Sequence, residues 1–544
     1  MLSEPAVGKA FFGRESVMRT LEKRVNALKG GYRQNVALTG QMLAGKSSIL
    51  YQLLYNLKDT SLIPLYIEVT EEPFSYFADR FIATLLYSYL SSCSRQAPKD
   101  LPNLINEAEV LIPHTIFAVK KIKAELKKKN YGNAYADLLN LTSLLKKESG
   151  KSCVVILDEF HKLEFFKIKK PYLHFGKIMM IQKDTMYIVS SSQKSTIKKI
   201  LSEKLALLYG NFEVIEVSGF DRKTAEAFLA EKLGNISLER DSADYLIDFT
   251  DGNPFYLDVF AKKIAETANS AKLFSAGEDA IVEAFTASLY NTSGTISQYF
   301  ANNIMRLLEK DLREPHMEVL IALAVGHNKL CDIAKYLGRK SRGGFSAKLA
   351  RLIELDMVYK NGVFYGIQDG VFGFWLRAVY HKRKTSLVDD VVNRTCDFKE
   401  AVKNDIGDYR CENQKDVPER IKELFLLFNG ETVEIEKKHR KLPRFVKIES
   451  QKYSNCTDLV SHQEPNRYWI CEVRRGRVDE SDIFDFIDRY NPMRERITKK
   501  ICVAPEGIDE NALLLAKEKN IWVWDLNNIN SLLRLYKRHN LIQR

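Results

Sequence analysis

The stretch GQMLAGKS at residues 40–47 places two glycines, a lysine and a serine at a spacing suited to phosphate chemistry. The glycines let the backbone curl so that its N–H groups face phosphate oxygens, and Lys46 can reach the β- and γ-phosphates. Ser47 offers a hydroxyl to a magnesium ion. We therefore expect this loop to bind a nucleotide. The contacting residues would be Gly40, Gln41, Met42, Leu43, Ala44, Gly45, Lys46, Ser47 and Ser48.

A second acidic element is expected with such a loop, and SCVVILDE at residues 152–159 has the required form. Its apolar run ends in Asp158 and Glu159. Asp158 would hold magnesium together with Ser47, and Glu159 would orient or polarise the attacking water. An ordinary strand followed by a solvated acidic turn is the alternative.

Three serines end a third apolar run, MYIVSSS at residues 186–192. Ser191 or Ser192 is our candidate for a polar side chain that senses the γ-phosphate, with Gln193 next. A capped loop after a strand explains the same residues equally well.

These groups need a parallel sheet to position them. NVALT at 35–39 reads as a strand entering the glycine loop, and residues 47–57 continue as an amphipathic helix. LIPLYIEV at 62–69 is another apolar strand. Strands this apolar fit a central sheet that is covered on both faces. The carboxyl ends of parallel strands would then bring the loop and the acidic pair together.

The order of four separated motifs resembles the archaeal-type ATPases of the STAND/AAA+ assemblage and, more distantly, origin-recognition ATPases. FFGRE (11–15) precedes the glycine loop and the acidic strand, and DGNPFYL (251–257) follows them. The resemblance implies that Phe12, Gly13 and Arg14 lie on one side of the adenine base. Pro254 would approach the base from a helical lid.

Residues 315–370 read as three helices and a glycine-turned hairpin, which is typical of a winged helix. The stretch from residue 335 to residue 351 is basic and carries no acid, as a helix in a DNA groove requires. Its candidate DNA contacts are Arg339, Lys340, Arg342 and Lys348. In STAND ATPases a winged helix often only packs on the nucleotide domain, so DNA contact is one of two readings.

The C-terminal part resembles a PD-(D/E)xK nuclease-like fold, with Asp458 before one strand and Glu472-Val-Arg474 on the next. Two carboxylates converging on magnesium could activate water. The family's lysine is replaced by Arg474, which stays charged and cannot act as a base, although it could clamp a phosphate. An active nuclease and a degenerate DNA-binding or interaction domain are both open.

Composition adds weaker constraints. The 544 residues carry a formal net charge of +12, which favours an anionic partner such as nucleic acid. The eight cysteines are spread singly and read as reduced thiols of a cytosolic protein. The apolar runs, such as residues 319–325, are too short to span a bilayer, and the N-terminus lacks a signal pattern. We expect a cytoplasmic protein without membrane contact.

These observations predict an α/β chain in five parts. They are a P-loop ATPase core (1–217), a helical lid (218–310), a winged helix (311–380), a connector (381–410) and a nuclease-like α/β domain (411–544). Length alone favours several domains.

The predicted function is that of a molecular switch that binds ATP and Mg²⁺, hydrolyses ATP and acts with DNA. A homo-oligomer or a protein partner is possible. The alternatives are an ATP-gated, metal-dependent DNA nuclease and a non-enzymatic DNA-binding regulator.

Overall fold

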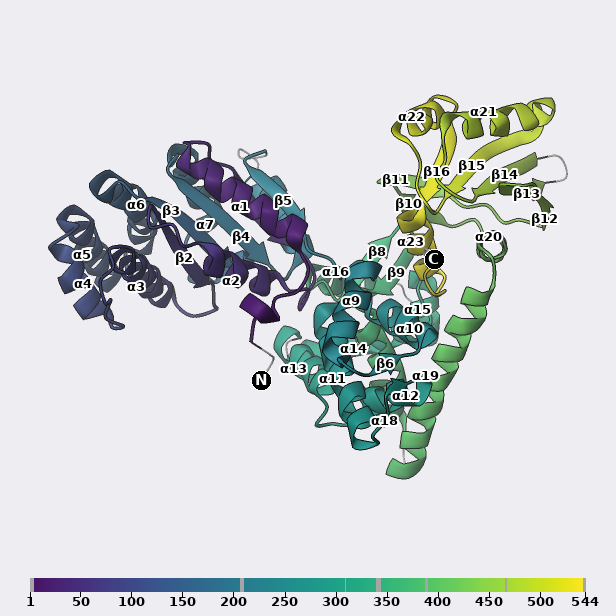
Figure 1. The fold of residues 1–544 in the computed structure, drawn as a ribbon, viewed down its shortest axis with the longest axis horizontal. Helices are drawn as coiled ribbons and strands as arrows, with labels where there is room; N and C mark the ends of the chain where they lie inside the picture. Colours follow the sequence, from purple (N-terminus) through teal and green to yellow (C-terminus); the bar gives the residue numbers. More distant parts are fainter. Residues whose placement is uncertain are drawn as a thin grey trace. The chain divides into compact units, whose positions relative to one another are not determined.

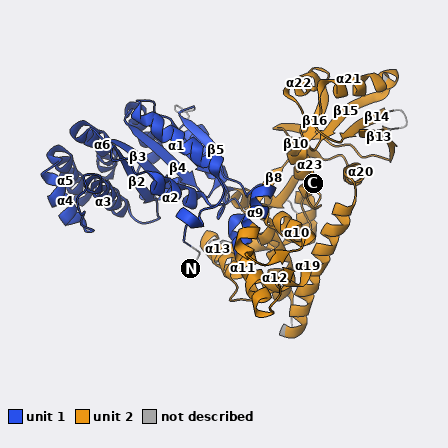
Figure 2. Ribbon diagram, in the orientation of Figure 1, with its two compact units in different colours: residues 1–228, 252–258, 354–356 blue, residues 229–251, 259–353, 357–544 orange. Residues whose placement is uncertain are grey.

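The computed structural model describes residues 4–205, 210–308, 310–338, 344–386, 390–464 and 467–541. It divides into two compact units (Figure 2). Unit 1 contains residues 1–228 with two short segments, 252–258 and 354–356. Unit 2 contains residues 229–251, 259–353 and 357–544. The chain therefore passes between the units several times.

A five-stranded, all-parallel sheet forms the centre of unit 1; the sequence predicted a parallel sheet and four of these strands, but not the one at residues 212–216. Its order is β2-β3-β4-β1-β5. The strands are β1 (Asn35–Thr39), β2 (Leu62–Glu68), β3 (Ser152–Asp158), β4 (Thr185–Ser191) and β5 (Phe212–Glu216). Every residue of β1, β3 and β4 is buried. Strands buried on both faces are apolar along their whole length, which explains why they were recognisable.

Alternate residues of each strand point to the two faces of this sheet and enter two separate cores. Val154 and Ile156 of β3 pack with α1 (Glu15–Lys29) and α2 (Lys46–Asn56). Val155 and Leu157 pack on the other face, with helices that include α3 (Phe74–Ser92), α6 (Tyr131–Ser149) and α7 (Pro171–Ile181). Figure 1 shows these layers. The remaining helices of unit 1 are α4 (Leu101–Glu109), α5 (Pro113–Lys127) and α8 (Lys194–Lys199).

Unit 2 begins with a helical region. Its helices are α9 (Arg222–Leu233, which starts in unit 1), α10 (Arg240–Thr250), α11 (Pro254–Ser270, which also starts in unit 1), α12 (Glu278–Phe285) and α13 (Thr295–Leu307). A short parallel pair joins β6 (Ser237–Leu238) to β7 (Ser275–Ala276). No helix among the described residues is long and apolar enough to cross a membrane.

Three helices and a hairpin follow in the predicted order. They are α14 (Lys310–Val325), α15 (Leu330–Tyr336) and α16 (Phe345–Glu354), then β8 (Val358–Asn361) paired antiparallel with β9 (Phe364–Ile367). After α17 (Gly370–Trp375) and α18 (Lys382–Thr385), the predicted connector is mostly the long helix α19 (Val391–Gln414). This helix is packed rather than free, because Tyr245 of α10 donates a hydrogen bond to Asp405 at 3.0 Å.

The C-terminal part of unit 2 is built on a mixed five-stranded sheet in the order β12-β13-β14-β15-β16. The strands are β12 (Lys447–Lys452), β13 (Cys456–Glu464), β14 (Arg467–Arg474), β15 (Ile497–Ala504) and β16 (Ile521–Asp525). The first three are antiparallel and the last three parallel. Apolar side chains of α20 (Val417–Leu426) and α23 (Leu526–Leu535) pack on one face, and those of α21 (Glu480–Arg489) and α22 (Glu510–Glu518) on the other.

The turn of the β8–β9 hairpin is covered by the small hairpin of β10 (Thr432–Ile435) and β11 (Lys438–Lys441). Val363 donates its backbone N–H to the carbonyl of Thr432 at 3.0 Å, and the side chain of Asn361 exchanges hydrogen bonds with the backbone of Glu434. Gly362 has φ +58°, and a Cβ there would lie 1.9 Å from the Thr432 oxygen. The tip of the hairpin is therefore a packed contact.

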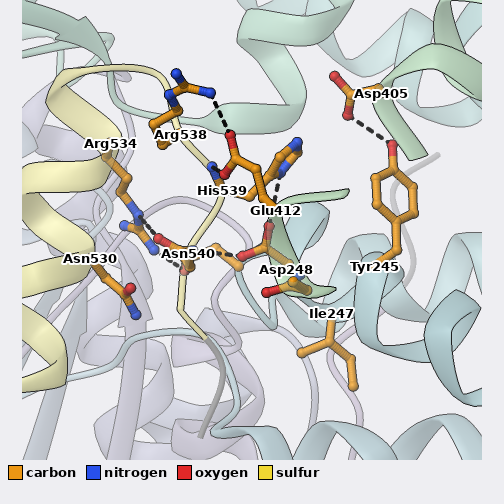
Figure 3. A network of polar contacts seen from close by, with 12 residues as sticks. Tyr245, Ile247, Asp248, Asp405, Glu412, Asn530, Arg534, Arg538, His539 and Asn540 are labelled. Carbon is orange, nitrogen blue, oxygen red and sulfur yellow. Dashed lines mark hydrogen bonds and ion pairs between the residues drawn. The ribbon is translucent and has the colours of Figure 1, made fainter. Parts of the chain in front are cut away.

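The end of α23 and the residues that follow it dock onto α10 and α19 through a polar network (Figure 3). The Asn540 side chain donates to Asp248 at 2.7 Å, and His539 lies 3.3 Å from the same carboxylate. Arg534 pairs with Asp251 at 2.5 Å, and Arg538 pairs with Glu412 of α19 at 3.0 Å. These contacts tie the C-terminal segment to helices much earlier in the chain.

Candidate functional site

The loop between β1 and α2 has the backbone that the glycines were expected to allow. Gly45 has φ +91°, a conformation that residues with a Cβ rarely adopt. Gly40 is required for a different reason, since a Cβ there would lie 2.2 Å from the carbonyl oxygen of Val217. Leu43 takes φ +63° between them. The loop ends in the N-terminus of α2, where a helix dipole favours phosphate.

Lys46 lies inside this loop. Its Nζ donates to the carbonyl oxygens of Gly40 at 2.9 Å and Gln41 at 2.7 Å. The side chain is 5% exposed, and burial lowers its pKa, while Glu159 and Asp158 act in the opposite direction. The ammonium group is thus held by weakly basic carbonyls, where a phosphate oxygen would be a stronger partner.

Asp158 sits at the end of β3 with its carboxylate surrounded by hydroxyls. Oδ2 accepts hydrogen bonds from Ser47 at 2.9 Å and from Tyr66 at 2.8 Å, and Oδ1 accepts one from Ser190. Burial, followed by the charge of Asp158, raises the pKa of Tyr66, so this phenol stays a donor. A hydroxyl beside a carboxylate is the hard oxygen set that magnesium prefers. Ser47 and Asp158 therefore fit the predicted metal.

Glu159 takes φ +54° and turns its carboxylate towards the end of β4. Oε2 accepts hydrogen bonds from the hydroxyl of Ser192 at 2.8 Å and its N–H at 3.3 Å, and His161 Nδ1 is 3.3 Å away. Burial, with Lys162 nearby, lowers the pKa of His161 to about 4, so the imidazole is neutral near pH 7. Glu159 is thereby held in one orientation.

The two candidate sensor serines occupy different places. Ser191 is buried, and its hydroxyl lies 2.9 Å from His161 Nδ1. Ser192 binds Glu159. Ser190, which the sequence analysis did not select, contacts Asp158 directly. Alternation along β4 could have indicated Ser190, because it lies on the same face as Ile188 in the core beside α2.

The FFGRE segment reaches the same loop. The Arg14 guanidinium donates to the carbonyl oxygen of Ala44 at 3.2 Å and also to the carbonyl of Ser218, and it lies 4.7 Å from the Phe220 ring centroid. Burial lowers its pKa. Arg14 thus fixes the loop to the segment after β5. Phe12 stacks edge-on with Phe220, at 6.2 Å between ring centroids.

Two more predicted residues lie close by. Gly13 has φ +62°, and a Cβ there would meet Thr224 at 2.8 Å. Pro254 belongs to unit 1, and its Cγ is 3.8 Å from the position a Cβ on Gly45 would take. Ser48 faces away from the loop, because its hydroxyl accepts the N–H of Ala6 at 3.1 Å.

Asp356 is a neighbour of this site that the sequence analysis missed. It lies between α16 and β8, in a segment of three residues that belongs to unit 1. Its carboxylate accepts the N–H of Ser195 at 3.1 Å and the Ser195 hydroxyl at 2.5 Å, directly after the serines of β4. Burial raises its pKa. Nothing in the local sequence links two residues that are 161 positions apart.

Of the candidate DNA contacts, Arg339, Lys340 and Arg342 lie outside the described residues. Lys348 is half-buried on α16, with its Nζ 5.4 Å from the ring centroid of Phe345. These predictions stay predictions.

The C-terminal candidates are brought together. Asp458 of β13 and Glu472 of β14 are cross-strand partners, and neither side chain is exposed. Arg474 does not face an open site: its Nε donates to Glu472 at 2.8 Å, and its other nitrogens bind Asp482. Arg489, which was not selected, pairs with both acids, at 2.5 Å from Asp458 and 3.0 Å from Glu472.

Comparison with known proteins agrees with the geometry of unit 1. Residues 11–260 match the profile of an ATPase domain found predominantly in Archaea. This region is therefore similar to an archaeal-type ATPase domain, and it has the α/β fold with a parallel central sheet that such a domain requires. The sequence matches no curated protein.

Several solved structures are similar over most of their length. The Walker-type ATPase PABY2304 of Pyrococcus abyssi is 18% identical with a TM-score of 0.47, covering 69% of this chain and 99% of that one. The ORC2 protein of Aeropyrum pernix is 12% identical with a TM-score of 0.40, covering 75% and 97%. The ORC1 protein of the same organism, solved with DNA, is 13% identical with a TM-score of 0.39, covering 68% and 93%.

Proposed function

We propose that the protein is a molecular switch that binds ATP with magnesium and hydrolyses ATP in unit 1. The observation that carries this proposal is the 2.9 Å contact between Ser47 and Asp158, beside the buried Lys46. A hydroxyl from the glycine loop and a carboxylate from a neighbouring strand would share one Mg²⁺. Lys46 would exchange its two carbonyl partners for phosphate oxygens.

Glu159 is our candidate for the residue that orients the attacking water. Its carboxylate is fixed by Ser192 and by neutral His161, so it would not have to be ordered at the moment of reaction. Ser190, Ser191 and Ser192 stand in a row at the end of β4, and Ser192 remains our candidate for a sensor because it couples to Glu159.

The proposal of a switch, rather than a simple hydrolase, is supported by chain connectivity. Residues 252–258 and 354–356 belong to unit 1, yet they are joined at both ends to unit 2. The first segment carries Pro254 beside the glycine loop, and the second carries Asp356 beside Ser195. A nucleotide-dependent shift at either place would pull directly on helices of unit 2.

We further propose DNA as the partner of unit 2, through a winged helix at 311–380. The net charge of +12 and the basic stretch before α16 support this. Because the hairpin tip is packed against β10, the contact would run through α16 and not through the wing. A winged helix that only packs and reports nucleotide state is the other reading. We also propose a helical lid at residues 218–310, a cytoplasmic location, and a homo-oligomer or a protein partner.

The test compares the wild type with Lys46→Ala, and Lys128→Ala, at an exposed lysine directly after α5, is the matched surface control. Nucleotide binding, phosphate release with Mg²⁺ and DNA binding at several salt concentrations would be measured. We expect turnover to vanish in Lys46→Ala alone. We also expect DNA affinity in the wild type to fall steeply with salt and to differ between ATP and ADP. A wild type that binds no nucleotide would overturn the proposal.

An ATP-gated nuclease is the second candidate, favoured by the pairing of Asp458 with Glu472 across β13 and β14. Divalent-dependent DNA cleavage that Glu472→Ala abolishes would establish it. The arginines bound to these carboxylates argue against it.

A further inference from the structure

Three side chains with metal-binding chemistry meet at the start of β13 and the end of β14. Cys456, Asp458 and Glu472 each offer one ligand atom, and these atoms lie within 4.8 Å of one another. All three residues are buried. A thiol and two carboxylates at such a spacing would ordinarily suggest a cation between them.

The position between these groups is taken by a nitrogen of the protein itself. Nη1 of Arg489 lies 2.5 Å from Asp458 Oδ2, 3.0 Å from Glu472 Oε2 and 3.6 Å from Cys456 Sγ. One atom therefore reaches all three. Arg489 is the last residue of α21, and its guanidinium also lies 4.3 Å from the ring centroid of Tyr453, which supports its orientation.

The surrounding charges fit a cation at this point. Two buried carboxylates face each other across adjacent strands, an arrangement that is costly without positive charge. Arg474 neutralises the far side of Glu472 and is anchored on Asp482. Asp458 also accepts the Tyr490 hydroxyl at 2.8 Å. Its Oδ1 is buried and has no hydrogen-bond partner among the residues that the structure describes, so it remains available as a ligand.

We propose that Arg489 permanently takes the place of a divalent cation in a Cys456–Asp458–Glu472 site. The arginine supplies the positive charge that holds β13 and β14 together, and it excludes a free metal from the same position. The C-terminal domain then performs no metal-dependent hydrolysis, and it serves as a DNA-binding or interaction domain.

The experiment removes the arginine and asks whether a metal takes its place. Co²⁺ is the probe, because a cobalt–thiolate bond produces a charge-transfer absorption that reports Cys456 directly. Binding would release the thiol proton to solvent. We expect Arg489→Ala to bind Co²⁺ at least about 100-fold more tightly than the wild type, with the thiolate band. The double variant Arg489→Ala/Cys456→Ser should lose that band.

Arg475→Ala is the matched control. Arg475 directly follows Arg474, its side chain is exposed, and it contacts none of the three ligands. It should behave as the wild type. Arg489→Gln serves as a second variant that keeps a long polar side chain. If Arg489→Ala or Arg489→Gln is folded only when Co²⁺ is present, the metal has replaced the arginine and the proposal stands.

Four results would overturn it. The wild type could bind Co²⁺ with the thiolate band, or cleave DNA in a manner that Glu472→Ala abolishes. A folded Arg489 variant could bind no more Co²⁺ than the wild type. Finally, both Arg489 variants could fail to fold with and without Co²⁺, which would mean that a metal cannot replace the Arg489 guanidinium. The Co²⁺ readouts require no ATP, so their failure leaves the proposal for unit 1 intact.

Discussion

Gly40→Ala offers a sharp test of the nucleotide loop because the structure predicts a collision of one atom with one atom. The new Cβ would lie 2.2 Å from the carbonyl oxygen of Val217, whereas real Cβ contacts below 3.0 Å essentially do not occur. One of the two backbones must therefore move by at least about 0.8 Å. Val217 is not free to yield, since its N–H donates to Thr39 at 2.7 Å and its side chain is buried.

The displacement should fall on the loop, and its cost follows from the chemistry of phosphate binding. Backbone N–H groups and Lys46 can stabilise a phosphate only if they point at it, and a misplacement of about 1 Å can cost about 100-fold in rate. We expect Gly40→Ala to lower ATP turnover by about that factor and to weaken nucleotide binding, with the circular dichroism of the chain unchanged. Phosphate release and binding of a fluorescent ATP analogue measure the two effects.

Gly132→Ala is the control, because it makes the same change at an exposed position in α6 where nothing lies within 4 Å of the new Cβ. It should keep wild-type turnover and gain up to about 1 kcal/mol in stability. The reasoning is refuted if Gly40→Ala binds and hydrolyses ATP as well as Gly132→Ala does.

Three further predictions concern the neighbours of this loop. Asp158→Asn should lower Mg²⁺-dependent ATP turnover by at least about 100-fold and leave Mg²⁺-free nucleotide binding unchanged; equal loss of both would argue for a structural role. Asp356→Ala removes the acceptor of the Ser195 N–H, so amide exchange of Ser195 should rise about tenfold or more, read by mass spectrometry, and unchanged protection would contradict the contact. Burial depresses the pKa of His161 from 6.5 to about 4, so its contribution to stability is complete above pH 6.5 and is lost as the pH falls towards 4. Acid unfolding of unit 1 should therefore be less steep in His161→Phe than in the wild type, and identical pH profiles would refute this.

Local pattern was enough to predict four of the five strands of the central sheet and the glycine loop, but not β5, which is only partly buried. Strands buried on both faces have to be apolar, and the loop needs glycines at fixed positions. Each of these features can therefore be recognised from residues that are adjacent in the sequence. By contrast, β11 and β12 were missed because KHRK and KIESQK are charged and mostly exposed, without the alternation that marks a half-buried strand. The helix α23 was also missed.

The missed site residues share a different cause. Ser190 and Tyr66 donate hydrogen bonds to Asp158, and His161 lies beside Glu159. Asp356 contacts Ser195 across 161 positions of the sequence. Such contacts depend on how elements pack and leave no local pattern. Arg474 was selected because it stands in place of the family's lysine, but the residue that contacts both Asp458 and Glu472 is Arg489, which lies outside any motif.

The docking of residues 534–540 onto α10 has a consequence for how the chain is made. His539 and Asn540 are synthesised 291 and 292 residues after their partner Asp248. At a ribosomal rate of about 5–20 residues per second, Asp248 is synthesised about 15–60 seconds before these two partners. During that time the nucleotide loop and Gly252–Pro254 have already left the ribosome. Unit 1 can therefore fold early and bind its ligand before residues 534–540 of unit 2 can dock onto α10.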